Sequence, residues 1–287
     1  MKPFLVYLIL SSALSSFSLT IVPIGDSLSY GVSNEADYFS KTVPSTGFRH
    51  PSIRDPNNGH AWDENKRRQN NSGQFVNFDL ISNQGWRGYL KDLLSRHLCT
   101  QESINFSGNW QQSPTAHFGY PGLQSSDLLE LLNSSRAQRF GGANVGKINE
   151  QLEQINQKTI ITYLVGINDI FNNKSIENII DDLKINIKKI ERSLENNNSS
   201  KSIIILTLPL LGPQHEQHNQ SIKDFNNELR WENFQQETNM TIHLLDLENL
   251  NRDFNGQVDD IHFSDFENRQ VAMKIYNKIS ALKGCSF

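Results

Sequence analysis

The chain has little cysteine, little net charge and no second long apolar run, and each shortage excludes a class of protein. Its 287 residues contain two cysteines, Cys99 and Cys285, which are too few for a cysteine-type zinc site. The formal net charge is −4 and lysine and arginine form no block, which argues against a surface for nucleic acid or anionic lipid. Beyond the first twenty residues, no apolar stretch is long enough to span a bilayer.

The first eighteen residues have the layout of a secretory signal peptide. Lys2 supplies a positive charge, an apolar core covers residues 4–10, and small residues follow at 15–18. The alternative is an uncleaved membrane anchor, which needs about 20 apolar residues, and here serine dilutes the stretch too early. We therefore expect a secreted protein with no stable membrane span once the signal peptide has been removed.

A secreted chain passes through the secretory pathway, in which disulfides form and asparagines are glycosylated. An even cysteine count favours a Cys99–Cys285 disulfide over two free thiols, provided that the two Cα atoms lie within about 7 Å. Asn-x-Ser/Thr acceptor sequences also recur, and the sequence leaves open which of them are used. They begin at Asn70, Asn105, Asn133, Asn173, Asn197, Asn198, Asn219 and Asn239.

Short apolar stretches alternate with amphipathic helical patterns. This alternation predicts a single α/β domain over residues 19–287, a three-layer α/β/α sandwich with a five-stranded parallel sheet. Residues 31–82 lack periodicity and are rich in Asn, Pro and Gly, so we interpret them as a long polar insertion. The predicted strands cover residues 19–25, 103–108, 159–166, 202–210 and 241–247, and the main helices cover 85–99, 125–140, 148–157, 175–195, 221–238 and 266–284.

Polar residues follow these strands, at the sheet edge where parallel α/β folds place their sites. Ser27 follows the first strand, and His262 follows the last. A serine hydroxyl needs an adjacent base to become a nucleophile, and His262 is the candidate. Asp259, three residues earlier, can hold the imidazole in the required tautomer. Asp260 remains an alternative acid, and Asp246, at the end of the last strand, is a weaker one.

Acyl transfer also needs hydrogen-bond donors aimed at the developing oxyanion. Gly122 lies between the second strand and its helix, and Asn168 follows the third strand. The backbone N–H groups of Ser27 and Gly122 and the side-chain amide of Asn168 can supply such donors. This chemistry requires no metal ion and no organic cofactor.

Four blocks of the chain, "PIGDSLSYG", "HFGYPGLQSSDLL", "LVGIND" and "DDIH", occur in the order found in the SGNH/GDSL hydrolase superfamily, which the chain resembles. The resemblance implies a flavodoxin-like hydrolase fold with Ser27 as nucleophile, His262 as base and Asp259 as acid. It also implies that Ser27, Gly122 and Asn168 form the oxyanion hole. The blocks around "GWRGYL" and "GYPGLQSSDLL" are most similar to acetylxylan esterases of carbohydrate esterase family three.

The expected function is therefore a secreted serine esterase that removes short acyl groups, acetyl in particular, from carbohydrate. A lipid-ester or thioester hydrolase of the same fold and a non-catalytic glycan-binding protein are the alternatives. Two features depart from the family: the histidine is followed by Phe263-Ser264 instead of a Pro-Asn type of pair, and the 31–82 insertion is longer than usual. The acyl group, the alcohol and the oligomeric state stay open.

Three further features are weaker candidates. His117 and Tyr120 lie in the "HFGYPG" block, where they are candidate substrate contacts. The segment "HEQH" at 215–218 suggests a metal site, but it lacks the His-Glu-x-x-His spacing and lies in a polar stretch before a helix. We interpret it as a solvated loop.

Overall fold

The computed structural model describes residues 18–30, 68–69, 75–76, 85–99, 102–108, 110–112, 115–120, 122–133, 148–252, 254 and 260–285. The predicted signal peptide lies outside the described residues. So does the predicted 31–82 insertion, apart from a short antiparallel pair that is formed by β2 (Arg68–Gln69) and β3 (Phe75–Val76).

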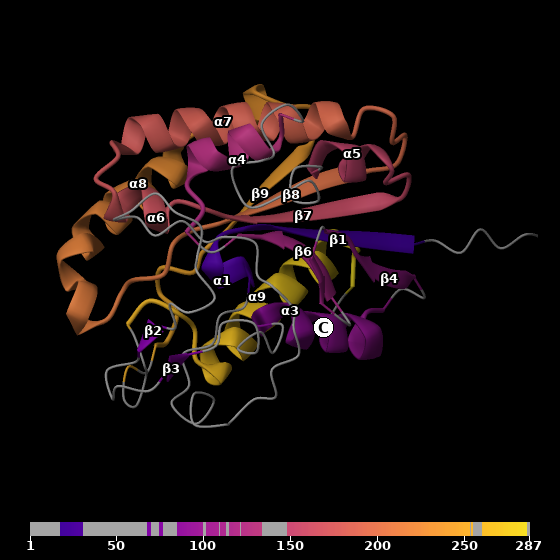
Figure 1. The fold of residues 1–287 in the computed structure, drawn as a ribbon. Coiled ribbons are helices and arrows are strands. Elements are labelled where there is room, and N and C mark those ends of the chain that lie inside the picture. The colour runs from indigo at the N-terminus through magenta and orange to yellow at the C-terminus, as the bar shows by residue number, and fades with distance from the viewer. Residues whose placement is uncertain are drawn as a thin grey trace, which may run out of the picture.

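A mostly parallel sheet forms the centre of the fold, in the order β5-β6-β1-β7-β8-β9, with β4 also beside β1 (Figure 1). Only β5 runs antiparallel to its neighbour in this sheet. The described strands are β1 (Ser18–Gly25), β4 (Ser103–Phe106), β5 (Trp110–Gln112), β6 (Thr115–Gly119), β7 (Lys158–Leu164), β8 (Lys201–Leu206) and β9 (Thr241–Leu245).

The predicted fold class is confirmed, but the expected strand count of five was too low. Two strands share one side of β1: β4 pairs with residues 18–21, and β6 pairs with residues 24–25. The prediction had treated residues 103–108 as the whole second strand. The site loop that was assigned to that strand instead follows β6, which a hairpin with β5 introduces.

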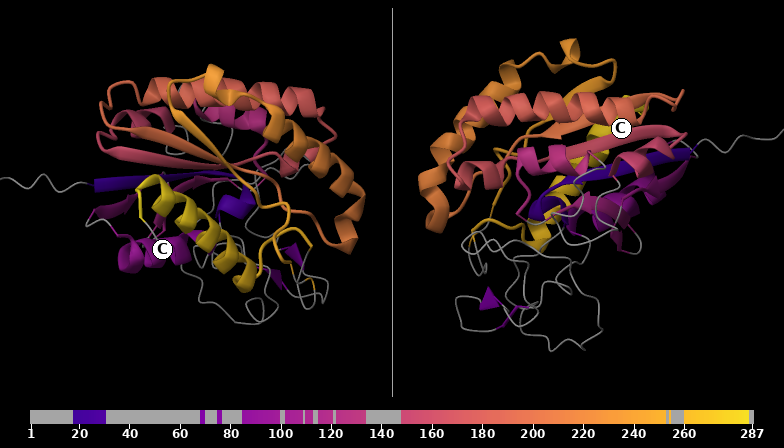
Figure 2. Two further views of the ribbon diagram at one scale, coloured as in Figure 1. Left: turned by 180° about the vertical axis from the view of Figure 1, so that it is seen from behind. Right: turned by 45° about the horizontal axis from the view of Figure 1, so that its top comes forward.

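Helices cover both faces of the sheet (Figures 1 and 2). α3 (Gly85–His97) packs against α9 (Asp265–Leu282) on one face. On the other face lie α4 (Ser125–Leu131), α5 (Ile148–Glu153), α7 (Ile176–Ser193) and α8 (Asn219–Trp231). Three short helical segments follow strands at the carboxyl edge: α1 (Ser27–Tyr30), α6 (Ile167–Phe171) and the 3-10 segment η3 (Pro213–His218).

The core follows from the apolar pattern of the strands and helices. All residues of β1 after Ser18 are buried, as expected of a central strand that is covered on both faces. In α7 the buried side chains recur every three or four residues, at Ile179, Leu183, Ile187 and Ile190, so one stripe of the helix faces the sheet. No helix in the described ranges is both long and apolar enough to cross a membrane.

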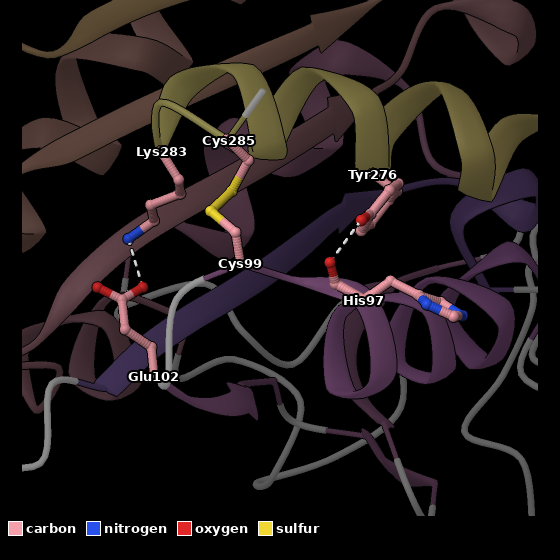
Figure 3. Close-up of a disulfide and its surroundings, with 6 residues drawn as sticks. All are labelled: His97, Cys99, Glu102, Tyr276, Lys283 and Cys285. Atoms are coloured by element: carbon pink, nitrogen blue, oxygen red, sulfur yellow. Dashed lines mark hydrogen bonds and ion pairs between the residues drawn. A yellow bond between two sulfur atoms is a disulfide. The ribbon is translucent and has the colours of Figure 1, made fainter. Parts of the chain in front are cut away.

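The predicted disulfide is present and joins the end of α3 to the segment after α9 (Figure 3). The Cα atoms of Cys99 and Cys285 lie 5.8 Å apart, within the distance that a disulfide can bridge. Beside it, the Tyr276 hydroxyl donates a hydrogen bond to the His97 carbonyl oxygen at 2.9 Å. Glu102 accepts one from Lys283 at 2.6 Å. The two helices are therefore joined covalently and by polar contacts.

Removing this disulfide is expected to lower the free energy of unfolding by about 2–5 kcal/mol, because it restricts the unfolded chain over a separation of 186 residues. The measurement is denaturant unfolding of wild type and of the Cys99→Ser/Cys285→Ser variant, each with and without reductant. Reductant should shift the wild-type midpoint and leave that of the variant unchanged. Equal midpoints for oxidised wild type and variant would contradict a stabilising disulfide.

Candidate active site

The nucleophile candidate lies at a sharp strand-to-helix junction. Ser27 is the first residue of α1, directly after β1, and it is 8% exposed. Gly25 makes this turn possible, because an added Cβ there would collide with the backbone carbonyl of Leu164 on β7. Asp26 Oδ1 accepts a hydrogen bond from the Leu28 N–H at 2.9 Å. This hydrogen bond stabilises the turn between β1 and α1.

The electrostatics of Asp26 link this turn to His262. Burial raises the pKa of Asp26 to about 7, and the hydrogen bond from the Leu28 N–H opposes that shift. An electrostatic interaction with His262 also acts to lower the Asp26 pKa, whereas the charge of Asp169 acts to raise it. Such effects require short separations in a protein interior. His262 and Asp169 therefore lie near the residue that precedes Ser27, although both are far away in the sequence.

The two further oxyanion-donor candidates, Asn168 and Gly122, are linked through Leu123. The Asn168 side-chain Nδ2 donates to the Leu123 carbonyl oxygen at 3.1 Å, next to Gly122. An amide nitrogen carries two N–H donors, so this bond fixes the group and uses one of them. Gly122 has φ of +80° and Gly166, before α6, has φ of +134°, so both positions favour glycine.

Asp169 adds a second set of hydrogen bonds between α6 and the segment that follows Gly122. Its carboxylate accepts hydrogen bonds from the Ser125 N–H at 2.9 Å and from the Ser125 hydroxyl at 2.7 Å. Lys174 Nζ lies 3.2 Å from Asp169 and also contacts Asp182. Burial raises the pKa of Asp169, and these hydrogen bonds and Lys174 act against the shift. Asp169 thus ties the start of α4 to α6.

The acid of the triad is the part of the predicted site that the structure does not describe. Asp259 lies outside the described residues. The alternative acid, Asp260, is buried and its Oδ2 accepts a hydrogen bond from the Gln214 N–H at 2.6 Å. Asp246 binds Thr207 at 3.0 Å and Arg230 at 3.0 Å. Both alternatives are thus engaged with other groups, and Asp259 stays the predicted partner of His262.

The sequence analysis missed a buried ion pair that holds the His262 loop. Arg252 Nε lies 3.1 Å from Glu267 Oε1, and their side chains are 4% and 0% exposed. Arg252 also donates to the carbonyl oxygens of His262 at 3.0 Å and Leu210 at 2.8 Å. Glu267 completes a capping box with Ser264 at the start of α9. The Ser-x-x-Glu spacing was the available signal for that half of the arrangement.

The two candidate substrate contacts lie in the interior. His117 is 0% exposed and its Nδ1 accepts from the Gly119 N–H at 2.9 Å, while Tyr120 is 3% exposed. Their burial speaks against a wide contact with a large substrate, and both roles stay predictions. The "HEQH" segment forms η3, where His215 and His218 pack against the ring of Phe171. Among the described residues, no three His, Cys, Asp or Glu side chains gather as a metal site.

Taken together, α1 and α6 follow β1 and β7 at the carboxyl edge of the sheet (Figure 1). The Gly122 segment is tied to this edge by hydrogen bonds from the Tyr120 N–H to the Gly25 carbonyl oxygen and from Asn168 to the Leu123 carbonyl oxygen, and His262 interacts electrostatically with Asp26. Each element positions one predicted functional group: a hydroxyl, a backbone N–H, an amide and an imidazole. A nucleophile, a base and oxyanion donors are the groups that acyl transfer requires.

Comparisons with solved structures show the same fold. A family 3 carbohydrate esterase from Clostridium thermocellum has a TM-score of 0.54 and 16% identity, over 94% of this chain and 100% of that one. A family 3 carbohydrate esterase from Talaromyces cellulolyticus has a TM-score of 0.51 and 13% identity, over 94% and 100%. Est24, a carbohydrate acetylesterase from Sinorhizobium meliloti, has a TM-score of 0.51 and 13% identity, over 92% and 100%.

The predicted family resemblance is confirmed at the level of sequence. No curated protein matches the chain. The model of the GDSL-like lipase/acylhydrolase family matches residues 21–275, which include Ser27, Gly122, Asn168 and His262. The chain therefore belongs to the GDSL-like lipase/acylhydrolase family and is a carboxylic ester hydrolase.

Proposed function

We propose that this protein is a secreted serine esterase that removes short acyl groups, acetyl in particular, from carbohydrate. The observations that carry the proposal are the hydrogen bonds that tie the Gly122 segment to the end of β1 and to α6, together with the electrostatic interaction between Asp26 and His262. The family 3 esterases that share the fold support the choice of carbohydrate as the alcohol.

In the proposed reaction, Ser27 Oγ attacks the ester carbonyl carbon while His262 accepts the hydroxyl proton. Asp259 orients the imidazole. The N–H groups of Ser27 and Gly122 and the Asn168 amide bind the oxygen of the tetrahedral intermediate. The intermediate then collapses: the bond from the acyl carbon to the sugar oxygen breaks, and this oxygen takes the proton from His262 and leaves as the free sugar hydroxyl. Water next attacks the acyl-serine with His262 as base, releasing the carboxylic acid and restoring Ser27.

Secretion is supported by the layout of residues 1–18 and by the disulfide, because both suit the secretory pathway. Glycosylation is proposed only where the asparagine side chain is accessible. Asn198 is exposed. Asn197 is 2% exposed and donates to the Gln157 carbonyl oxygen at 2.7 Å, so the folded protein shields it from modification.

The test is acetate release from acetylated xylan by the protein expressed in an oxidising compartment, with 4-nitrophenyl acetate as a second substrate. Ser27→Ala serves as the negative control. Acetate release from xylan that Ser27→Ala lacks would support the proposal. Turnover of the small ester alone would retain the mechanism and reject this polysaccharide, and a preference for long-chain esters would point to a lipid substrate.

Replacing Asn168 with Ala is expected to lower kcat by about 10²- to 10³-fold with a smaller effect on KM, because an oxyanion donor acts mainly in the transition state. The measurement is steady-state kinetics on 4-nitrophenyl acetate. Asn178→Ala is the matched control, since Asn178 is an exposed asparagine of α7, away from the proposed site. A kcat for Asn168→Ala within about threefold of wild type would contradict the assignment.

A further inference from the structure

A cluster of three rings lies beside the proposed oxyanion hole. Phe171 is the last residue of α6, three positions after Asn168, so both side chains project from the same side of this short helix. The Phe171 ring centroid lies 4.8 Å from that of His218 and 5.6 Å from that of His215. All three side chains are partly exposed, so part of the ring cluster faces solvent.

The imidazoles of this ring cluster come from η3, which is held against the loop of the catalytic base. The Gly212 N–H donates to the Asp260 carbonyl oxygen at 3.1 Å. The Gln214 N–H donates to the Asp260 carboxylate at 2.6 Å, two residues before His262. The ring cluster therefore connects the helix that carries Asn168 with the segment attached to the His262 loop.

A polar pocket continues from the ring cluster. Its volume is about 470 Å³, within the range of small-ligand sites. Its lining residues belong to α6, the α6–α7 connection, the start of α7, η3 and the start of α8. His218 belongs to both the pocket and the ring cluster. They are Ile170, Asn173, Lys174, Ser175, Ile176, Gln217, His218 and Ser221.

We propose that this pocket binds a sugar unit of the glycan whose ester is cleaved at Ser27. The proposal rests on the proposed function and specifies where the alcohol portion of its substrate lies. The pocket presents amide, hydroxyl and ammonium groups, which match the hydroxyls of a pyranose, and two isoleucines and an adjacent ring suit the C–H face of a sugar. The ring cluster then forms the surface between this subsite and the acyl carbon.

The chemistry of the lining favours a sugar over other ligands. None of the eight lining residues is acidic, so the pocket offers no partner for a cationic ligand. Only two of the eight are aliphatic, which is unlike the mostly apolar wall that an acyl chain prefers.

The first experiment measures binding without turnover. Unacetylated xylo-, cello- and manno-oligosaccharides are titrated by calorimetry into the Ser27→Ala protein. Ser221→Trp is then added to fill the pocket from α8, where Ser221 is exposed. We expect at least one oligosaccharide to bind and Ser221→Trp to weaken that binding about tenfold. Gln217→Ala, which removes an exposed lining amide, should weaken it in the same direction without affecting the core.

Asn227→Trp is the matched control, because Asn227 is an exposed neutral residue on α8 outside the pocket. It should leave oligosaccharide binding unchanged. On enzymes with Ser27 intact, Ser221→Trp should lower the ratio of kcat/KM on acetylated xylo-oligosaccharide to that on 4-nitrophenyl acetate about tenfold. If none of the oligosaccharides binds, the proposed subsite is overturned. Equal effects of Ser221→Trp and Asn227→Trp on oligosaccharide binding would overturn it as well. Lack of turnover of any ester by wild type would instead reject the proposed function.

Discussion

Ser27→Ala is expected to reduce kcat on 4-nitrophenyl acetate by about 10⁴- to 10⁶-fold, because it removes the only atom that can carry the acyl group in the proposed reaction. His262→Ala should cause a loss of the same order. The two residues act as a unit, so the double variant should be scarcely slower than either single one. Steady-state kinetics at matched protein concentrations provide the measurement.

Ser29→Ala is a stringent control for this result. Ser29 lies two residues further along α1 and is 1% exposed, and its hydroxyl lies a long 3.5 Å from the Ile24 carbonyl oxygen. The same chemical change there should keep activity within a few-fold. Mass spectrometry after reaction with a serine-directed phosphonate should locate the adduct on Ser27. An adduct elsewhere, or full activity of Ser27→Ala, would reject the nucleophile.

The strands that dominate the sheet could be predicted because burial on both faces gives them continuous apolar runs. β1 and β7 were located this way to within about two residues, a normal uncertainty for element boundaries. β5 and β6 were missed since "WQQSPTAHFG" contains polar residues and a proline, and its strand character arises from pairing beside β1. Sequence periodicity carries no signal for such tertiary pairing.

The sequence singled out the candidate site residues, but it did not identify the residues that hold them in place. Ser27, Gly122, Asn168 and His262 were identified because each follows a strand and parallel strands end at one edge. The Arg252–Glu267 pair could not be predicted, because residues fifteen positions apart across a loop show no pattern in sequence. The pocket near α8 was also missed, since "HEQH" was interpreted as a solvated loop although its two histidines pack on Phe171.

Glu267→Gln is expected to lower the free energy of unfolding by about 3 kcal/mol or more, because it leaves the guanidinium of Arg252 buried without its counter-charge. In the variant, Arg252 still donates hydrogen bonds to the carbonyl oxygens of Leu210 and His262. We therefore expect a folded variant and not complete loss of structure. Denaturant unfolding measures the change. Asp92→Asn is the control: its ion pair with Arg96 has side chains 53% and 69% exposed, so its loss should change stability by less than about 1 kcal/mol.

The same variant tests whether this ion pair serves the site as well as the fold. Arg252 binds the backbone of the loop that carries His262, and Glu267 caps α9 directly after it. If the pair positions the imidazole, kcat should fall at temperatures where Glu267→Gln is fully folded, and Ser27 should react more slowly with a phosphonate. If the variant is destabilised but keeps wild-type kcat, then Arg252 holds the loop only against unfolding.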